Sequence, residues 1–151
     1  MRTNFTTYSD GCAFASRIHY ELKRAERYRI FLSLAIFNVG PILDLAGNGA
    51  LASIEDRKSF LNNLNGILKR SIREVDSISN SGRLKIGLLM PETSRQGAEA
   101  VVRRVNRTIN EFCSDYFQKP ADYLVPTEIS SFPDAAGARS VASYLDEFME
   151  E

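Results

Sequence analysis

The sequence contains few of the residues that build metal centres and disulfide frameworks. Its 151 residues include two cysteines and one histidine. Cys12 and Cys113 fit no metal-site spacing and are too few for a disulfide framework, which favours a reducing, cytoplasmic setting. His19 stands far along the chain from every candidate nucleophile, so the sequence indicates no nucleophile and base pair. We therefore expect a protein without a resident metal or cofactor.

Long apolar runs and an excess of one charge are also missing. No stretch of about 18 apolar residues occurs, and Met1 to Phe5 has no signal-peptide core, so a soluble protein is expected. Nineteen basic and nineteen acidic residues give a formal net charge of +0, which predicts no general attraction to nucleic acid or membrane. The length and the 44% hydrophobic content suit one domain over residues 1–151, with a core from about 14 to 148.

The spacing of the apolar residues predicts helices and strands. A nearly continuous apolar run from Ile30 to Val39 is typical of a strand covered on both faces. Helical periodicity marks residues 14–25, 60–72 and 98–112, and a last helix is expected over 138–147. Residues 123–131 form another expected strand, and Pro126 favours an edge position or a bulge there.

A hairpin lies at the centre of this pattern. Residues 76–78 and 84–90 are its two expected strands, and Ser79 to Gly82 is its expected turn. We expect residues 40–52 to be a connection without regular structure. The order of the elements predicts an α/β fold, with a mixed central sheet flanked by helices as in nucleotide cyclases and polymerase palm domains.

Three stretches carry a more specific pattern. They read RAERYRIFLSLAIFNV from Arg24, LLMPET from Leu88 and ISSFPD from Ile129. In this order, they resemble the strand entry, the hairpin exit and a later strand of the diguanylate cyclase (GGDEF) family of bacterial signalling proteins. The resemblance extends roughly from Phe14 to Phe148, and it implies the cyclase fold.

The same alignment replaces the residues that the family uses for catalysis. Joining two GTP molecules requires Mg²⁺, which prefers carboxylate ligands. The resemblance places Asn38 and Gly40 at the family's metal-binding aspartates. It places GRLKI, residues 82–86, on the GGDEF signature, so that Gly82 alone is kept. The family's phosphate-binding loop corresponds to residues 42–49, which contain no lysine.

The substituted signature residues oppose nucleotide binding for separate reasons. Arg83 puts a long side chain where the nucleotide needs close approach to the backbone. Leu84 cannot bind a metal, and the charge of Lys85 repels cations. These positions predict that the chain is not an enzyme.

One functional motif of the family keeps its register. Arg73 and Asp76 match the RxxD motif, with Asp76 six residues before Gly82. Arg104 stands where the family can supply a further arginine, and its neighbour Arg103 takes this place if the register slips by one residue. The resemblance implies binding of cyclic di-GMP, because an arginine offers paired donors to phosphate or guanine and an aspartate accepts from guanine. The alternative is structural, since arginines are common at helix ends and an aspartate that opens a strand often caps local amides.

Three hypotheses follow from the sequence. The first is a catalytically inactive GGDEF-like domain that regulates signalling through a protein partner. The second is a cyclic di-GMP receptor that uses Arg73, Asp76 and Arg104. The third is an enzyme with altered nucleotide chemistry. A cluster of basic residues at 69–73 and 103–107 would form one positive face if the second and third helices lie side by side.

Overall fold

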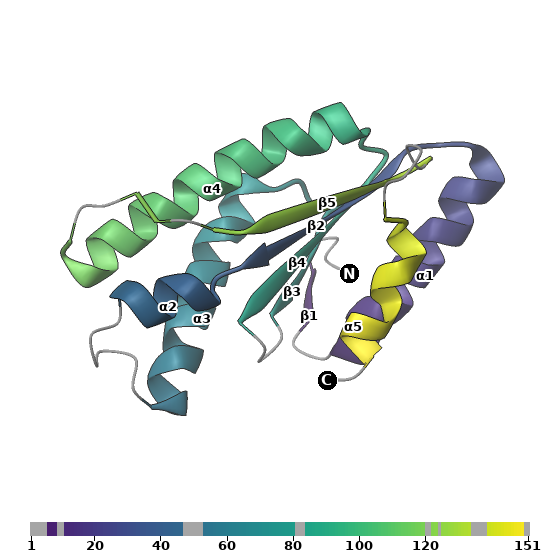
Figure 1. The fold of residues 1–151 in the computed structure, drawn as a ribbon. Helices are drawn as coiled ribbons and strands as arrows, with labels where there is room; N and C mark the ends of the chain where they lie inside the picture. Colours follow the sequence, from purple (N-terminus) through teal and green to yellow (C-terminus); the bar gives the residue numbers. More distant parts are fainter. Residues whose placement is uncertain are drawn as a thin grey trace.

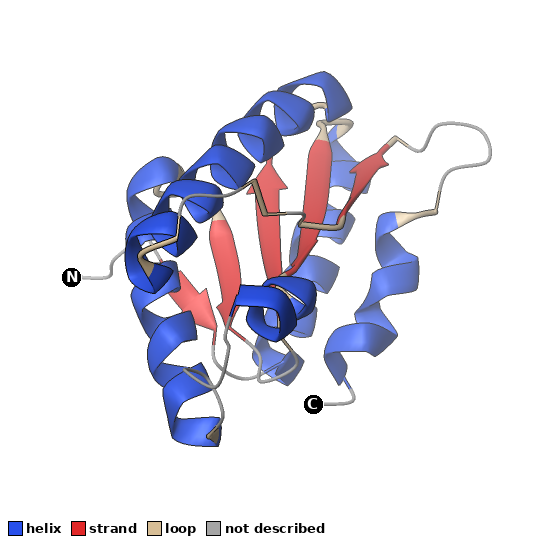
Figure 2. Cartoon of the chain, turned by 60° about the vertical axis from the view of Figure 1, so that its left-hand side comes forward, coloured by secondary structure: helices blue, strands red, loops and turns tan. Residues whose placement is uncertain are grey.

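A computed structural model describes residues 6–8, 11–46, 53–80, 84–119, 122–123, 125–133 and 139–149. A five-stranded sheet lies between two layers of helices (Figures 1 and 2). The strands are β1 (Thr6–Tyr8), β2 (Leu32–Asn38), β3 (Ser77–Asn80), β4 (Lys85–Pro91) and β5 (Thr127–Phe132). The helices are α1 (Gly11–Tyr28), α2 (Gly40–Ala46), α3 (Ile54–Leu68), α4 (Arg95–Phe117) and α5 (Leu145–Met149), and 3₁₀ turns cover η1 (Lys69–Ser71) and η2 (Val141–Tyr144).

The strand order is β1-β3-β4-β2-β5. β1 runs parallel to β3, and every other neighbouring pair is antiparallel. The strand β2 pairs along its length with β4, the middle strand of the sheet, from Leu32 opposite Pro91 to Asn38 opposite Lys85. The sheet is therefore mixed, and the predicted α/β class is confirmed.

Each face of the sheet is covered by its own apolar core. α3 and α4 pack on one face, where alternate residues of β2 and β4 such as Phe37 and Ile86 are buried. α1, η2 and α5 pack on the other face, where Leu34 and Leu89 are buried. The nearly continuous apolar run of β2 supplies both cores, because successive side chains of a strand point to opposite faces.

Close packing on the α1 face explains one glycine of β4. A Cβ atom on Gly87 would lie 2.8 Å from the ring of Phe14 and 2.9 Å from that of Phe148. These rings meet edge to face, with centroids 4.8 Å apart. Glycine is needed at this position because the rings occupy the space of any side chain.

Several predicted elements differ from those observed. Residues 40–46, expected to lack regular structure, form α2, whose apolar Ile42 and Leu43 pack into the core beside α3. β3 continues through Ser79 and Asn80, which the sequence placed in the turn, because both residues pair with β4. β1 was not predicted, since three residues carry too little periodicity and its partner β3 is distant in sequence.

The other boundaries shift by a few residues. α3 and α4 begin earlier than predicted, because Ser53 and Ser94 cap them through their side-chain oxygens. β5 starts directly after Pro126, four residues later than predicted, and it forms an edge of the sheet, which is one of the two placements that Pro126 predicted. Among the described residues, no helix is long and apolar enough to cross a bilayer.

Candidate functional site

The first candidate site lies where β2 ends and α2 begins. Asn38, at the family's metal position, uses its side-chain oxygen to accept the backbone N–H of Gly40 at 3.0 Å. A Cβ atom on Gly40 would approach this oxygen to 3.1 Å, so the cap is tight. The backbone N–H of Asn38 donates to the carbonyl of Pro126 at 2.9 Å. The amide oxygen of Asn38 therefore supports the start of α2.

Leu84 and Lys85 face this cap from the beginning of β4. Leu84 adopts a left-handed backbone conformation with a φ of 60°, and its carbonyl accepts the N–H of Val39 at 2.9 Å. Its half-buried side chain packs against the core, within 4 Å of a Cβ placed on Gly40. Lys85 stands opposite Asn38 in the β2–β4 ladder. The described part of this site thus presents an amide, an apolar side chain and an ammonium group.

Two of the signature positions, Gly82 and Arg83, lie outside the described residues, as do residues 47–49 of the loop that aligns with the phosphate-binding segment. Asp44, within that segment, is exposed on α2. Over the described ranges, no three His, Cys, Asp or Glu side chains gather closely enough to hold a metal ion.

The second candidate site is the RxxD pair. The Arg73 guanidinium donates to Asp76 at 2.9 Å, and the backbone N–H of Arg73 donates to the other carboxylate oxygen of Asp76, also at 2.9 Å. The Asp76 side chain is only 3% exposed, whereas that of Arg73 is 52% exposed. The carboxylate therefore closes the turn before β3, and part of the guanidinium remains open to solvent.

Arg73 also reaches across to the end of β4. Its Nη2 atom donates to the carbonyl of Pro91 and to the hydroxyl of Thr93, both at 2.7 Å. The Thr93 hydroxyl donates in turn to the Pro91 carbonyl at 3.0 Å. We call the network of Arg73, Asp76, Pro91 and Thr93 the arginine clasp. Thr93 was not predicted to have a role. The one indication of it in the sequence is a polar residue shortly after the second hairpin strand.

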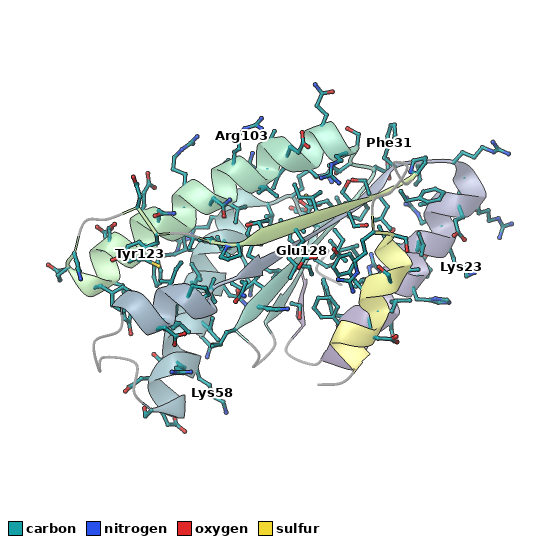
Figure 3. The ribbon with its side chains drawn as sticks, in the orientation of Figure 1. Lys23, Phe31, Lys58, Arg103, Tyr123 and Glu128 are labelled. Carbon is teal, nitrogen blue, oxygen red and sulfur yellow. The ribbon has the colours of Figure 1, made fainter. Side chains whose placement is uncertain are left out.

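Arg104 lies beside the clasp on α4. Its guanidinium donates to the backbone carbonyl of Ser71, two residues before Arg73. Figure 1 shows α3 and α4 side by side on one face of the sheet, which is the arrangement needed for one positive face. The neighbouring Arg103 is exposed on the outer side of α4 (Figure 3). The structure therefore brings the three candidate ligand-binding residues Arg73, Asp76 and Arg104 into one region.

A solved structure reproduces this architecture. It is the crystal structure of the diguanylate cyclase SiaD in complex with its activator SiaC from Pseudomonas aeruginosa. The likeness has a TM-score of 0.59 at 17% sequence identity, and it covers 91% of this chain and 54% of that one. The chain has the fold of a diguanylate cyclase. It spans about half the length of SiaD, and at this identity the likeness concerns the fold alone.

The comparisons by sequence are negative. No family model matches the chain, and no curated protein matches it.

Proposed function

We propose that this chain is a GGDEF-like domain without cyclase activity that regulates signalling by binding a protein partner. The use of Asn38 and Leu84 carries this proposal. In place of metal-binding carboxylates, the end of β2 has an amide committed to Gly40, and the start of β4 has a leucine packed on the core. Recovering a Mg²⁺ site there requires new ligands and loss of the α2 cap.

The structural neighbour supports the second half of the proposal. SiaD was solved in complex with its protein activator SiaC. A diguanylate cyclase whose structure includes this fold thus works with a protein partner. In the present chain, a protein partner would bind a domain whose function depends on its surface and not on catalysis.

An assay of turnover tests the catalytic part. Purified protein is incubated with GTP and Mg²⁺, and in parallel with GTP or ATP and Mn²⁺, and products are separated by chromatography. We expect no cyclic di-GMP and no other nucleotide product, because Asn38, Gly40 and Leu84 offer no carboxylate at the positions that the resemblance aligns with the family's metal ligands. Product that scales with protein concentration would establish an enzyme and overturn the proposal.

A second candidate function is a cyclic di-GMP receptor, which rests on the half-exposed guanidinium of Arg73 beside Asp76 and Arg104. Isothermal titration with cyclic di-GMP tests it. If the site binds, Arg73→Lys should weaken binding by roughly tenfold or more, because lysine loses the paired donors of the guanidinium while keeping the charge. Arg70→Lys is the matched control, since Arg70 is an exposed arginine one turn earlier. Absence of heat with the unmodified protein rejects the receptor function.

A further inference from the structure

The outward face of α1 contains an open hollow of about 330 Å³. Its lining consists of Tyr20, Lys23, Arg24, Arg27 and Tyr28, whose spacing places them on one side of the helix. We call these five residues, together with Phe31 in the turn before β2, the α1 surface. None of the three candidate hypotheses drawn from the sequence used these residues.

Exposed aromatic side chains are concentrated on the α1 surface. Tyr20, Tyr28 and Phe31 are 58%, 61% and 53% exposed, and only two other described large hydrophobic residues, Val75 and Tyr116, are exposed. Tyrosine and arginine dominate the energetic centres of protein interfaces, because each combines a large contact area with directional hydrogen bonding. Figure 3 shows Phe31 and Lys23 projecting at the end of the molecule where α1 leads into β2.

The lining of the hollow holds three cations and no carboxylate. Arg24 pairs with Glu92 at 3.1 Å, and this hydrogen bond raises the pKa of Arg24. The contact of Lys23 with Glu26 is long, at 3.9 Å. Arg27 stacks over the ring of Tyr28, with its guanidinium carbon 5.5 Å from the ring centre. Lys23 and Arg27 can therefore donate hydrogen bonds to carboxylates of a partner.

The α1 surface is held in place from behind. Ile18, Leu22 and Ala25, on the opposite side of α1, are buried against the sheet. The carbonyl of Phe31 accepts the N–H of Glu92 at 2.8 Å, which fixes the turn to the end of β4. A surface that is ordered before binding loses little conformational entropy on association, so its contacts count more fully toward affinity.

Resting on the proposed function, we propose that the α1 surface docks an acidic segment of a partner protein, whose apolar side chains pack between Tyr20 and Tyr28. Carboxylates of the segment pair with Lys23 and Arg27. A second copy of this chain is disfavoured as the occupant, because a two-fold contact would place the same cations face to face. An anionic membrane is disfavoured because its charge is spread over the whole surface and would meet Glu26 and Glu92 as well as the cations, whereas a protein segment can place its carboxylates at Lys23 and Arg27 alone.

This surface is separate from the altered catalytic positions. α1 leads into the first residue of β2, Leu32, whereas Asn38 is the last residue of that strand. A partner on the α1 surface therefore contacts the molecule near the other end of β2. Docking there needs neither a nucleotide nor a metal.

Site-specific photo-crosslinking in the native host tests the proposal. The photoreactive residue benzoylphenylalanine replaces Tyr28 or Phe31 in the full chain, and Val75 or Tyr116 as matched controls that are also exposed and apolar. We expect Tyr28 and Phe31 to form an adduct with a protein rich in aspartate and glutamate at the crosslinked segment. The controls should give no adduct with it.

Charge reversal then tests the chemistry with the purified partner. The double variant Lys23→Glu with Arg27→Glu should lose affinity by roughly tenfold or more, and the affinity of the unmodified chain should fall as salt rises. Arg103→Glu with Arg107→Glu is the matched control, because it reverses two exposed cations at the same spacing on α4. Equal affinity of the two double variants for the partner would overturn the proposal that the docked segment is acidic.

The outcomes separate this inference from the proposed function. A protein adduct that forms only at Val75 or Tyr116 overturns the α1 surface and leaves a regulatory domain with a partner elsewhere. An adduct that forms at position 28 or 31 with lipid or with a second copy of the chain overturns the proposal of an acidic protein partner. No protein adduct at any of the four positions overturns both proposals.

Discussion

Arg73 joins two distant parts of the fold, and the proposed receptor function would use the same side chain. Its guanidinium joins the start of β3 to the end of β4 through Asp76, Pro91 and Thr93. The sequence left open whether this residue serves a ligand or the structure. The contacts show that Arg73 has a structural role, and about half of its side chain is exposed to solvent.

Removing this side chain should lower stability even without a ligand. We expect Arg73→Ala to reduce the free energy of unfolding by about 1–3 kcal/mol, because the buried Asp76 carboxylate loses its charged partner and keeps only a backbone donor. Urea denaturation followed by circular dichroism measures this change. Arg70→Ala should stay within about 0.5 kcal/mol of the unmodified protein. Coinciding unfolding curves for the two variants would contradict the structural role of the clasp.

At the scale of elements, α2 occupies the position where the resemblance implied a phosphate-binding loop. The helix is short, and its first amide is satisfied by the side chain of Asn38. Its apolar residues pack against the α3 side of the core. Asn38 therefore stands at the position that the resemblance aligns with a metal-binding aspartate, and it also supports the start of this helix.

This dual role predicts different results for two substitutions of Asn38. Asn38→Ala should cost about 1 kcal/mol of unfolding free energy, because the Gly40 N–H loses its acceptor. Asn38→Asp keeps an acceptor, so its stability should stay close to that of the unmodified protein. It should still give no cyclic di-GMP, since Leu84 and Lys85 remain. Urea denaturation and the GTP assay measure the two effects, and turnover by Asn38→Asp would show that a single carboxylate restores the metal site.

At the scale of the whole molecule, the sheet separates two apolar cores that share the strand β2. Cys113 of α4 lies in the core between α4 and the sheet, with no measurable exposure. Burial raises the pKa of its thiol to about 12. The thiol is therefore protonated and inaccessible in the folded protein, and only the thiolate reacts with alkylating reagents.

Labelling of Cys113 should report unfolding of the molecule. In a Cys12→Ser background, we expect iodoacetamide at pH 8 to modify Cys113 only as fast as the chain unfolds. Mass spectrometry across a urea series should give labelling that follows the loss of circular dichroism. Rapid labelling without urea would show that α4 opens locally while the rest of the fold persists.

Local chemistry explains which parts of the fold could be predicted. The apolar run of β2 and the helical stripes of α1, α3 and α4 are repeated over many residues, so their period identifies the element and its buried face. β1 and α2 were missed because both are short and gain stability from distant partners. The residues at the positions that the resemblance aligns with the family's carboxylates could also be read directly, because they depend only on the sequence and on that resemblance.

The sequence by itself determined the class of fold and the burial of both sheet faces. Tertiary structure alone decided that Arg73 binds Pro91 and Thr93, that Arg104 rather than Arg103 contacts the segment before Arg73, and that the outer face of α1 forms a hollow. The physical reason is the separation along the sequence over which each feature acts. Periodicity records what each segment buries, whereas a hydrogen bond or a surface between distant segments exists only after the segments have packed together.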